Sequence, residues 1–252
     1  MILTLTPNPS IDATISLHEE IQLGAVHRAE SVSQVAGGKG VNVTHAVALA
    51  GVDTLALVPA REDDHFLSLT AADSIPVEAI PMDRTIRINT TLTEPDGRTT
   101  KLNGPGPVLS ADTQRAVLDA VAAHAPKAEW LVMAGSLPKG VPTEWYTQLV
   151  AAARAANPEL RIAVDTSDAP MVALGDNLGT AAPDLIKPNG LELGQLAGVD
   201  GQALEKAAEG GDYSGVVEAA RVVVKRGIPE VLVTLGGAGA VLVTADEAWV
   251  AT

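Results

Sequence analysis

The sequence predicts an α/β protein in which a mostly parallel sheet is flanked by helices and carries a small β-sheet lid. Short continuous runs of Val, Leu and Ile alternate with longer amphipathic segments, the pattern of buried parallel strands joined by helices. Apolar residues make up 46% of the 252 residues, which is enough for a large core in a single domain. One segment, residues 85–103, departs from this rhythm and is rich in Thr, Ile and Asn.

The elements of the main sheet follow in order along the chain. Strands are expected at Ile2–Thr6, Leu55–Val58, Trp130–Ala134, Arg161–Val164, Asp184–Lys187, Glu230–Thr234 and Ala240–Val243. Helices are expected at Lys39–Ala50, Ser110–His124, Thr143–Ala156 and Ser214–Arg226. Gly51 and Gly227 follow two of these helices, as glycine often does at a helix end, and Gly198–Asp212 is expected to be a surface loop. Because ligands of parallel sheets bind beyond the carboxyl ends of the strands, we expect functional residues in the loops there.

The lid is predicted from two extended stretches. Apolar and polar residues nearly alternate along Thr85–Glu94, Pro95–Gly97 is expected to form a turn, and Arg98–Asn103 is expected to form the returning strand. This pattern indicates a β-hairpin with a polar face. Ile11–Val35 also lacks a helical period. We expect the lid to be formed from about residues 11–35 and 84–105.

Charge and composition exclude several classes of function. Lysine and arginine total 17 against 31 acids, a net charge of −14, whereas nucleic acid and anionic membranes require a basic face. The chain has no cysteine, which excludes disulfides and thiolate catalysis. It has no apolar run of about 20 residues and its first residues do not read as a signal peptide, so we expect a cytoplasmic protein. Aromatic residues are only 2%, and any ligand is therefore expected to be held by polar groups and backbone amides.

The densest motif is Ala36–Asn42, in which three glycines surround Lys39 at an expected helix start. Glycines let the backbone approach a ligand closely, and a helix N-terminus favours anions. Lys39 adds a positive charge and Asn42 lies about one turn further, so an anion site is favoured over a flexible turn. The motif is not a Walker A loop, because Ser33 occupies its first glycine position and Gly40 its Ser/Thr position.

Two other loops offer polar groups directly after expected strands. Asp12 ends Thr6–Asp12, where a carboxylate can accept hydrogen bonds from two vicinal hydroxyls, although a turn carboxylate that caps local amides is the alternative. Ser136 lies in Gly135–Gly140. It is not a nucleophile elbow, because Ala134 stands two residues before it, and contact with a phosphate or hydroxyl is the better hypothesis.

Two later loops suggest a nucleotide and a metal. In Lys187–Glu192, Asn189 and Glu192 lie three residues apart and can hold a hydrated magnesium ion, although a helix start with an early glutamate is the alternative. Thr234–Gly239 offers amides for a phosphate, and a tight hairpin explains it nearly as well.

Three further patterns do not support an additional functional motif. Neither Gly104–Gly106 nor Gly237–Gly239 is followed by glycine three residues later, so a Rossmann fingerprint fails. Asp165 and Asp168 could form a carboxylate pair, but turn residues at a strand end are the preferred interpretation. The five histidines show no H-x-x-x-H spacing.

In this order, the motifs resemble the PfkB (ribokinase-like) carbohydrate kinases, and within them the 1-phosphofructokinases and tagatose-6-phosphate kinases. The resemblance covers essentially the whole chain. Its most specific parts are Thr6–Asp12, Ala36–Asn42, Arg87–Asn89 leading into Leu92–Gly97, Gly135–Gly140 and Leu185–Leu193. It implies a ribokinase-like fold, a single kinase domain over residues 1–252, and ATP and Mg²⁺ as cofactors.

The resemblance also implies roles for individual residues. Those implied for the sugar hydroxyls are Asp12, Gly38 and Asn42. Those implied for the phosphate of the substrate are Lys39, Arg87, Lys101 and Ser136. Those implied for the nucleotide are Lys187, Asn189, Thr234, Gly236 and Gly239, and Glu192 completes the N-x-x-E pattern linked to magnesium.

The activity that the resemblance implies is ATP-dependent phosphorylation of a ketohexose phosphate, with fructose 1-phosphate to fructose 1,6-bisphosphate as the first expectation. A tagatose-6-phosphate kinase or another PfkB sugar kinase is the alternative, and a non-catalytic sugar-phosphate-binding protein is a second. The family's glycine-rich segment with its aspartate base does not occur in the 252 residues, so we expect the general base beyond Thr252 in a longer protein. The expected partner is a small phosphosugar, and by analogy with the fold the lid also suits a homodimer.

Overall fold

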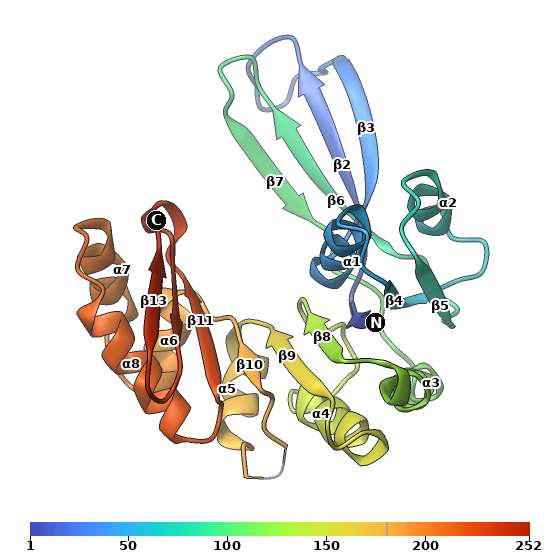
Figure 1. Cartoon of the computed structure of the whole chain (residues 1–252). Helices are drawn as coiled ribbons and strands as arrows, with labels where there is room; N and C mark the ends of the chain where they lie inside the picture. Colours follow the sequence, from blue (N-terminus) through green and yellow to red (C-terminus); the bar gives the residue numbers. More distant parts are fainter. Residues whose placement is uncertain (180) are drawn as a thin grey trace.

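The computed structural model describes residues 1–179 and 181–252 and contains two sheets (Figure 1). In the described residues the large sheet has nine strands, in the order β13-β12-β11-β10-β9-β8-β1-β4-β5. Their bounds are β1 Ile2–Leu5, β4 Thr54–Ala60, β5 Val77–Pro81, β8 Trp130–Ala134, β9 Arg161–Asp165, β10 Leu185–Ile186, β11 Glu230–Thr234, β12 Ala240–Val243 and β13 Ala248–Ala251.

The neighbouring strands of this sheet from β11 through β10, β9, β8, β1 and β4 to β5 run parallel to one another. Strands β12 and β13 are antiparallel additions at one edge. Strand β1 lies between β4 and β8, with Leu3 opposite both Leu55 and Leu131. Leu3 and Leu131 are fully buried, as expected for a parallel sheet covered on both faces. Parallel direction brings the loops after β1, β8, β9 and β11 to the same edge, which confirms the predicted architecture.

Helices connect the strands and flank the sheet (Figure 1). Their bounds are α1 Lys39–Leu49, α2 His65–Ala72, α3 Ala111–His124, α4 Trp145–Ala156, α5 Asp168–Asp176, α6 Gly190–Ala197, α7 Gly201–Glu209 and α8 Ser214–Lys225, with 3₁₀ turns at Ala125–Lys127 and Gly236–Ala238. Ser110 caps α3 by accepting a hydrogen bond from the backbone amide of Thr113, a role that serine often has directly before a helix. In the described residues no helix has the length and apolar character that crossing a membrane requires.

The core is mainly aliphatic, and three aromatic side chains are buried in it: Phe66, Trp145 and Tyr146. Tyr146 sits beneath the loop that follows β8, and its hydroxyl donates to the backbone oxygen of Gly135 at 2.8 Å. Burial raises the pKa of the Tyr146 hydroxyl, so it remains a neutral donor. This bond holds the backbone at Gly135, where φ is +119°, a conformation that favours glycine.

The small sheet contains β2 Ser10–Leu17, β3 Ala29–Gly37, β6 Arg87–Thr93 and β7 Thr99–Asn103, in the order β3-β2-β6-β7. It projects from the large sheet (Figure 1). The predicted hairpin is confirmed: the turn between β6 and β7 closes through the Gly97 amide, which donates to the Glu94 oxygen at 2.9 Å. The chain passes from β1 into β2 through only four residues, and this short link fixes the small sheet beside the carboxyl end of β1.

The prediction of a surface loop at Gly198–Asp212 is wrong, because Gly201–Glu209 forms helix α7. The Asp200 side chain caps this helix through the amides of Gln202 and Ala203. Leu204 and Ala208, four residues apart, are both buried. Gly198 does end α6 in the left-handed conformation, but the turn is short and the next helix, α7, begins at Gly201.

Candidate active site

The loops at the carboxyl edge of the large sheet meet the base of the small sheet around a cleft of about 330 Å³. The lining residues are Asn8, Ser10, Asp12, Gly38, Lys39, Asn42, Arg87, Asn89, Asn103, Gly135, Ser136 and Ser167. They include every residue that the sequence assigned to the sugar or its phosphate except Lys101. Segments more than a hundred residues apart therefore converge on one site.

Asp12 lies in β2 with its carboxylate held from two sides. The hydroxyl of Ser10 donates to Asp12 Oδ1 at 2.8 Å, and the Asn89 amide donates to the same oxygen at 3.0 Å. These bonds fix the orientation of the carboxylate at the wall of the cleft. Since an ionised carboxylate has several acceptor positions, Asp12 retains the capacity to accept hydrogen bonds from ligand hydroxyls.

The glycine-rich motif forms the start of α1 and packs tightly against β1. The hydroxyl of Thr6 accepts a hydrogen bond from the amide of Val41 at 2.9 Å. A Cβ atom at Gly40 would stand 2.5 Å from that hydroxyl oxygen, and one at Gly38, where φ is +122°, would stand 2.7 Å from the Thr6 methyl group. Only glycines therefore let the helix N-terminus, which favours anions, reach this depth in the cleft.

Arg87, at the start of β6, is held by two backbone oxygens. Its Nη2 donates to Asn8 O at 3.2 Å and its Nη1 to Gly104 O at 3.4 Å. Burial lowers the pKa of Arg87, and the charge of Asp12 opposes this shift. Within the described chain, Arg87 Nε and Asn89 Oδ1 are buried without a hydrogen-bond partner, so the cleft contains polar atoms that a ligand could satisfy.

Two lysines meet at Asp165, the last residue of β9. Lys39 Nζ lies 2.8 Å from Asp165 Oδ1, and Lys187 Nζ lies 3.3 Å from Asp165 Oδ2. Asp165 is 15% exposed and Lys39 is 50% exposed. One carboxylate thus links the cation assigned to the sugar phosphate with the cation assigned to the nucleotide. The sequence interpretation of Asp165 as a turn residue missed this arrangement, because the three residues come from three distant loops.

The residues assigned to the nucleotide lie on neighbouring loops of the same edge. Asn189 forms an isolated parallel bridge with Thr234. The Thr234 amide donates to the oxygen of Pro188 at 3.0 Å. Gly236 and Gly239 have φ of +56° and +91° in the tight turn between β11 and β12. The amide of Gly239 donates to Gly236 O at 3.1 Å, so it already serves the hairpin that the sequence left open as an alternative.

Glu192 forms a capping box with Asn189 at the start of α6. Asn189 Oδ1 accepts a hydrogen bond from the backbone N–H of Glu192, and Glu192 Oε2 accepts one from the backbone N–H of Asn189, both at 2.8 Å. The helix-start interpretation therefore applies here. The capping box does not use Glu192 Oε1. Because Mg²⁺ keeps several waters and requires only one or two carboxylates, this loop also fits a magnesium ion.

Lys101 lies in the exposed strand β7 and does not line the cleft. The strand register pairs Lys101 with Thr91 and Asn103 with Asn89. Side chains two residues apart share a face of a strand, so Lys101 is on the same face of the small sheet as the cleft residues Asn89 and Asn103, one step further from the large sheet.

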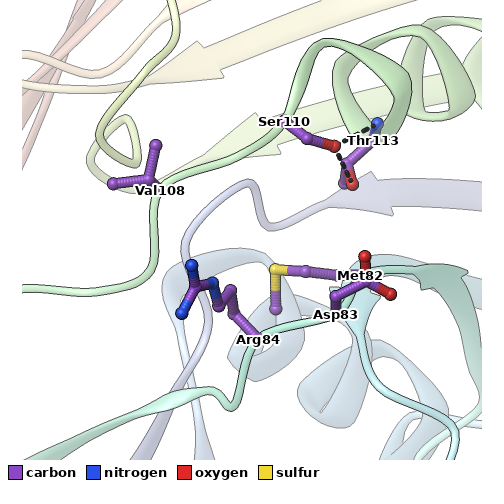
Figure 2. A pocket seen from close by; sticks show the side chains of 6 residues that line it. All are labelled: Met82, Asp83, Arg84, Val108, Ser110 and Thr113. Carbon is purple, nitrogen blue, oxygen red and sulfur yellow. Dashed lines mark hydrogen bonds between the residues drawn. The ribbon is translucent and has the colours of Figure 1, made fainter.

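A second hollow, of about 410 Å³, lies outside the cleft, between the segment after β5 and the start of α3 (Figure 2). It is lined by Met82, Asp83, Arg84, Val108, Ser110 and Thr113. The Ser110 hydroxyl already accepts from the Thr113 amide at 3.1 Å. That first-turn amide is consequently engaged, unlike the start of α1, which has no side-chain cap.

The comparison with known proteins agrees with this geometry. The model of the pfkB family of carbohydrate kinases matches residues 6–251. The chain belongs to this family. A 1-phosphofructokinase of Xanthomonas campestris pv. campestris is 35% identical over 252 residues, which are 99% of this chain and 76% of that protein.

Solved structures of the family show the same fold. The chain matches phosphofructokinase-2 from Escherichia coli in complex with fructose-6-phosphate with a TM-score of 0.86 and 29% identity, covering 100% of this chain and 79% of that one. The same E. coli protein has been solved in a tetrameric inhibited form, with a TM-score of 0.84, 30% identity and coverage of 99% and 78%. The ribokinase of Arabidopsis thaliana, at 18% identity, matches with a TM-score of 0.70 over 100% of this chain and 77% of that one. The predicted ribokinase-like fold is thus confirmed.

Proposed function

We propose that this protein transfers the γ-phosphoryl group of ATP to a fructose phosphate, with fructose 1-phosphate as substrate and fructose 1,6-bisphosphate as product. The observation that carries the proposal is the placement of Asp12 in the same cleft as Arg87, Ser136 and Lys39. A carboxylate suits sugar hydroxyls, whereas two cations and a hydroxyl suit a phosphate. A neutral sugar would not need this set of cations, and the 1-phosphofructokinase relatives support the same substrate.

The residues divide the work of binding. Asp12, Asn42 and the backbone at Gly38 would orient the sugar ring, while Arg87 and Ser136 would bind its phosphate. Lys39 is paired with Asp165 but half exposed, so its flexible side chain can turn toward the phosphate. Fixing the ring in this way leaves the free primary hydroxyl as the group positioned for attack.

The nucleotide would bind over the neighbouring loops, with Lys187, Asn189, Thr234, Gly236 and Gly239 around its phosphates. Glu192 would hold a magnesium ion through water, and the ion would supply positive charge to offset the charge of the transferring phosphoryl group. The oxygen of the primary hydroxyl attacks the γ-phosphorus, the bond to the ADP oxygen breaks, and the hydroxyl proton passes to a general base.

The small sheet would act as a lid over this reaction. Its strand register places Asp12, Asn89, Lys101 and Asn103 on one face, and the first two already bond to each other at the cleft. Closure would bring Lys101 toward the bound phosphate. It would also exclude water, which limits hydrolysis of ATP.

The opposite face of the lid is apolar and suits a second copy of the chain. The register aligns Ile15 with Val32 and Leu92, and Ile11 with Ile88. Val32 is 60% exposed and Ile88 is 48% exposed. We expect two lids to pack through this face in a homodimer. Light scattering should give the mass of a dimer for the wild type and of a monomer for the double variant Val32→Glu/Ile88→Glu; an unchanged mass for the variant would refute this interface.

The proposed activity is tested by a phosphate-transfer assay of the full-length protein with ATP. Fructose 1-phosphate, fructose 6-phosphate and tagatose 6-phosphate are compared with fructose as the neutral control. We expect the highest kcat/KM for fructose 1-phosphate and little turnover of fructose. Preference for another phosphate would reassign the substrate, and binding of a phosphosugar without any turnover would replace the kinase by a sugar-phosphate-binding protein.

A further inference from the structure

Asn8 contacts two of the residues that we assign to the phosphate of the sugar, Ser136 and Arg87. It lies in the loop between β1 and β2 and is only 6% exposed. Its side-chain Nδ2 donates to Ser136 Oγ at 3.2 Å. Its backbone oxygen accepts from Arg87 Nη2 at 3.2 Å. The sequence motifs around Asn8 did not assign it a role, because the contact to Ser136 spans 128 positions of the chain.

The bond to Asn8 determines which way the Ser136 hydroxyl can act. A serine hydroxyl has one hydrogen to donate and lone pairs that accept. Since Ser136 Oγ accepts from Asn8, its own hydrogen is left for another acceptor. Both side chains line the cleft, and a phosphate oxygen in the cleft is such an acceptor.

The loop after β7 packs against the Oδ1 end of the Asn8 amide. A Cβ atom at Gly106, where φ is +70°, would stand 2.5 Å from Asn8 Oδ1. Asn8 Oδ1 therefore lies against the backbone of Gly106, and among the described residues it has no hydrogen-bond partner. The glycine leaves room for the loop to pack against this end of the amide, while Nδ2 at the other end bonds to Ser136. The Gly104–Gly106 sequence, which does not match a dinucleotide-binding motif, thus lies beside residues that we assign to the phosphate of the substrate.

We propose that Asn8 is a positioning residue for the phosphate of the substrate. Its side-chain amide directs the Ser136 hydroxyl toward that phosphate, and its backbone carbonyl oxygen orients Arg87. The proposal rests on the proposed function, since it takes the ligand to be a phosphorylated sugar. It predicts an effect confined to the sugar side, because the contacts of Asn8 are to Ser136 and Arg87 and not to the loops assigned to the nucleotide.

A double-mutant cycle tests this inference. Asn8→Ala, Ser136→Ala and the double variant are titrated calorimetrically with fructose 1-phosphate and, as a minimal probe, with inorganic phosphate. Loss of one charge-assisted hydrogen bond should weaken fructose 1-phosphate binding by about tenfold in either single variant. If Asn8 acts through Ser136, the double variant should be within about twofold of Ser136→Ala, because the two changes remove one interaction. Multiplying losses would overturn the proposal.

Two further measurements separate positioning from general damage. In the kinase assay, Asn8→Ala should raise KM for the phosphosugar about tenfold while KM for ATP changes less than about twofold; equal changes would overturn the proposal. Asn8→Asp, which keeps the shape but accepts the Ser136 hydrogen, should bind phosphate more weakly than Asn8→Ala, and stronger binding would contradict the assigned direction. Asn157→Ala is the matched control, since Asn157 bonds to Ala125 O away from the cleft.

The outcome for Asn8 can be distinguished from the outcome for the proposed function. Turnover of the wild type decides whether the protein is a fructose-phosphate kinase. Binding of fructose 1-phosphate or inorganic phosphate decides the role of Asn8, and it can be measured whether or not turnover occurs. A non-additive cycle in a protein without turnover would refute the kinase and keep the positioning role. Additive losses of binding in a protein that does turn over the substrate would refute the positioning role and keep the kinase.

Discussion

Replacement of Lys39 by alanine should weaken phosphosugar binding far more than ATP binding. An ammonium–phosphate hydrogen bond contributes about 1.5–3 kcal/mol. Lys39 must first leave Asp165, and because Lys39 is 50% exposed, that ion pair contributes only about 0.2–1 kcal/mol. The difference, about 1–2 kcal/mol, corresponds to a roughly 5- to 30-fold rise in KM for fructose 1-phosphate.

The effect on ATP should be small because Lys39 reaches the nucleotide side only through Asp165. Without Lys39, the carboxylate of Asp165 keeps, among the residues that the structure describes, a single cation, Lys187 at 3.3 Å. Lys187 would then be held slightly more firmly and be slightly less available to ATP, so we expect KM for ATP to rise less than threefold, about 0.6 kcal/mol or less.

The assay measures initial rates with each substrate varied at saturating concentration of the other. Lys127→Ala, which removes the same charge from the 3₁₀ turn before β8, is the control and should leave both KM values unchanged. Equal increases in the two KM values for Lys39→Ala would refute the assignment of Lys39 to the sugar phosphate.

Two predictions concern the framework of the site. Gly40→Ala should lower the free energy of unfolding by about 1–3 kcal/mol because its Cβ would press against Thr6, whereas Gly237→Ala, with open space around it, should not; equal Tm values for both variants would contradict the packing argument. The pKa of Glu94 is lowered by its hydrogen bond to Arg98 and by the amide of Ile21, so its stabilisation is present above the ordinary glutamate pKa of about 4.3 and is lost as pH falls through the lowered value. Urea unfolding should therefore show Glu94→Gln less stable than wild type at pH 7, with the difference shrinking toward pH 3; a constant difference would refute this.

The main sheet could be predicted because its signals are local. The strands Trp130–Ala134, Glu230–Thr234 and Ala240–Val243 have the predicted bounds, since each is an apolar run buried in the sheet. Short helices were harder to predict: Gly201–Glu209 follows a glycine turn, and Leu204 and Ala208 are its only buried side chains larger than that of glycine, too few for a clear period.

Half of the site could be predicted for a related reason. Ser136 stands in the loop directly after β8, Asp12 lies in β2 just beyond β1, and Lys39 begins α1 just beyond β3. The segments that follow β1 and β8 meet because these two strands are parallel, and Lys39 joins them because the start of α1 packs against Thr6. The partners of these residues could not be predicted. Asp165 acquires its function from two lysines on other loops, and Asn8 from a serine 128 positions away. Such pairings depend on strand order, which sequence spacing does not contain.

A crystal structure of the protein with fructose 1-phosphate would test the placement of the phosphosugar most directly. We expect the phosphate within hydrogen-bond distance of Ser136 Oγ and Arg87, and the ring hydroxyls on the carboxylate of Asp12. A phosphosugar bound in the hollow between Arg84 and Thr113, or one with its phosphate remote from Ser136 and Arg87, would contradict it.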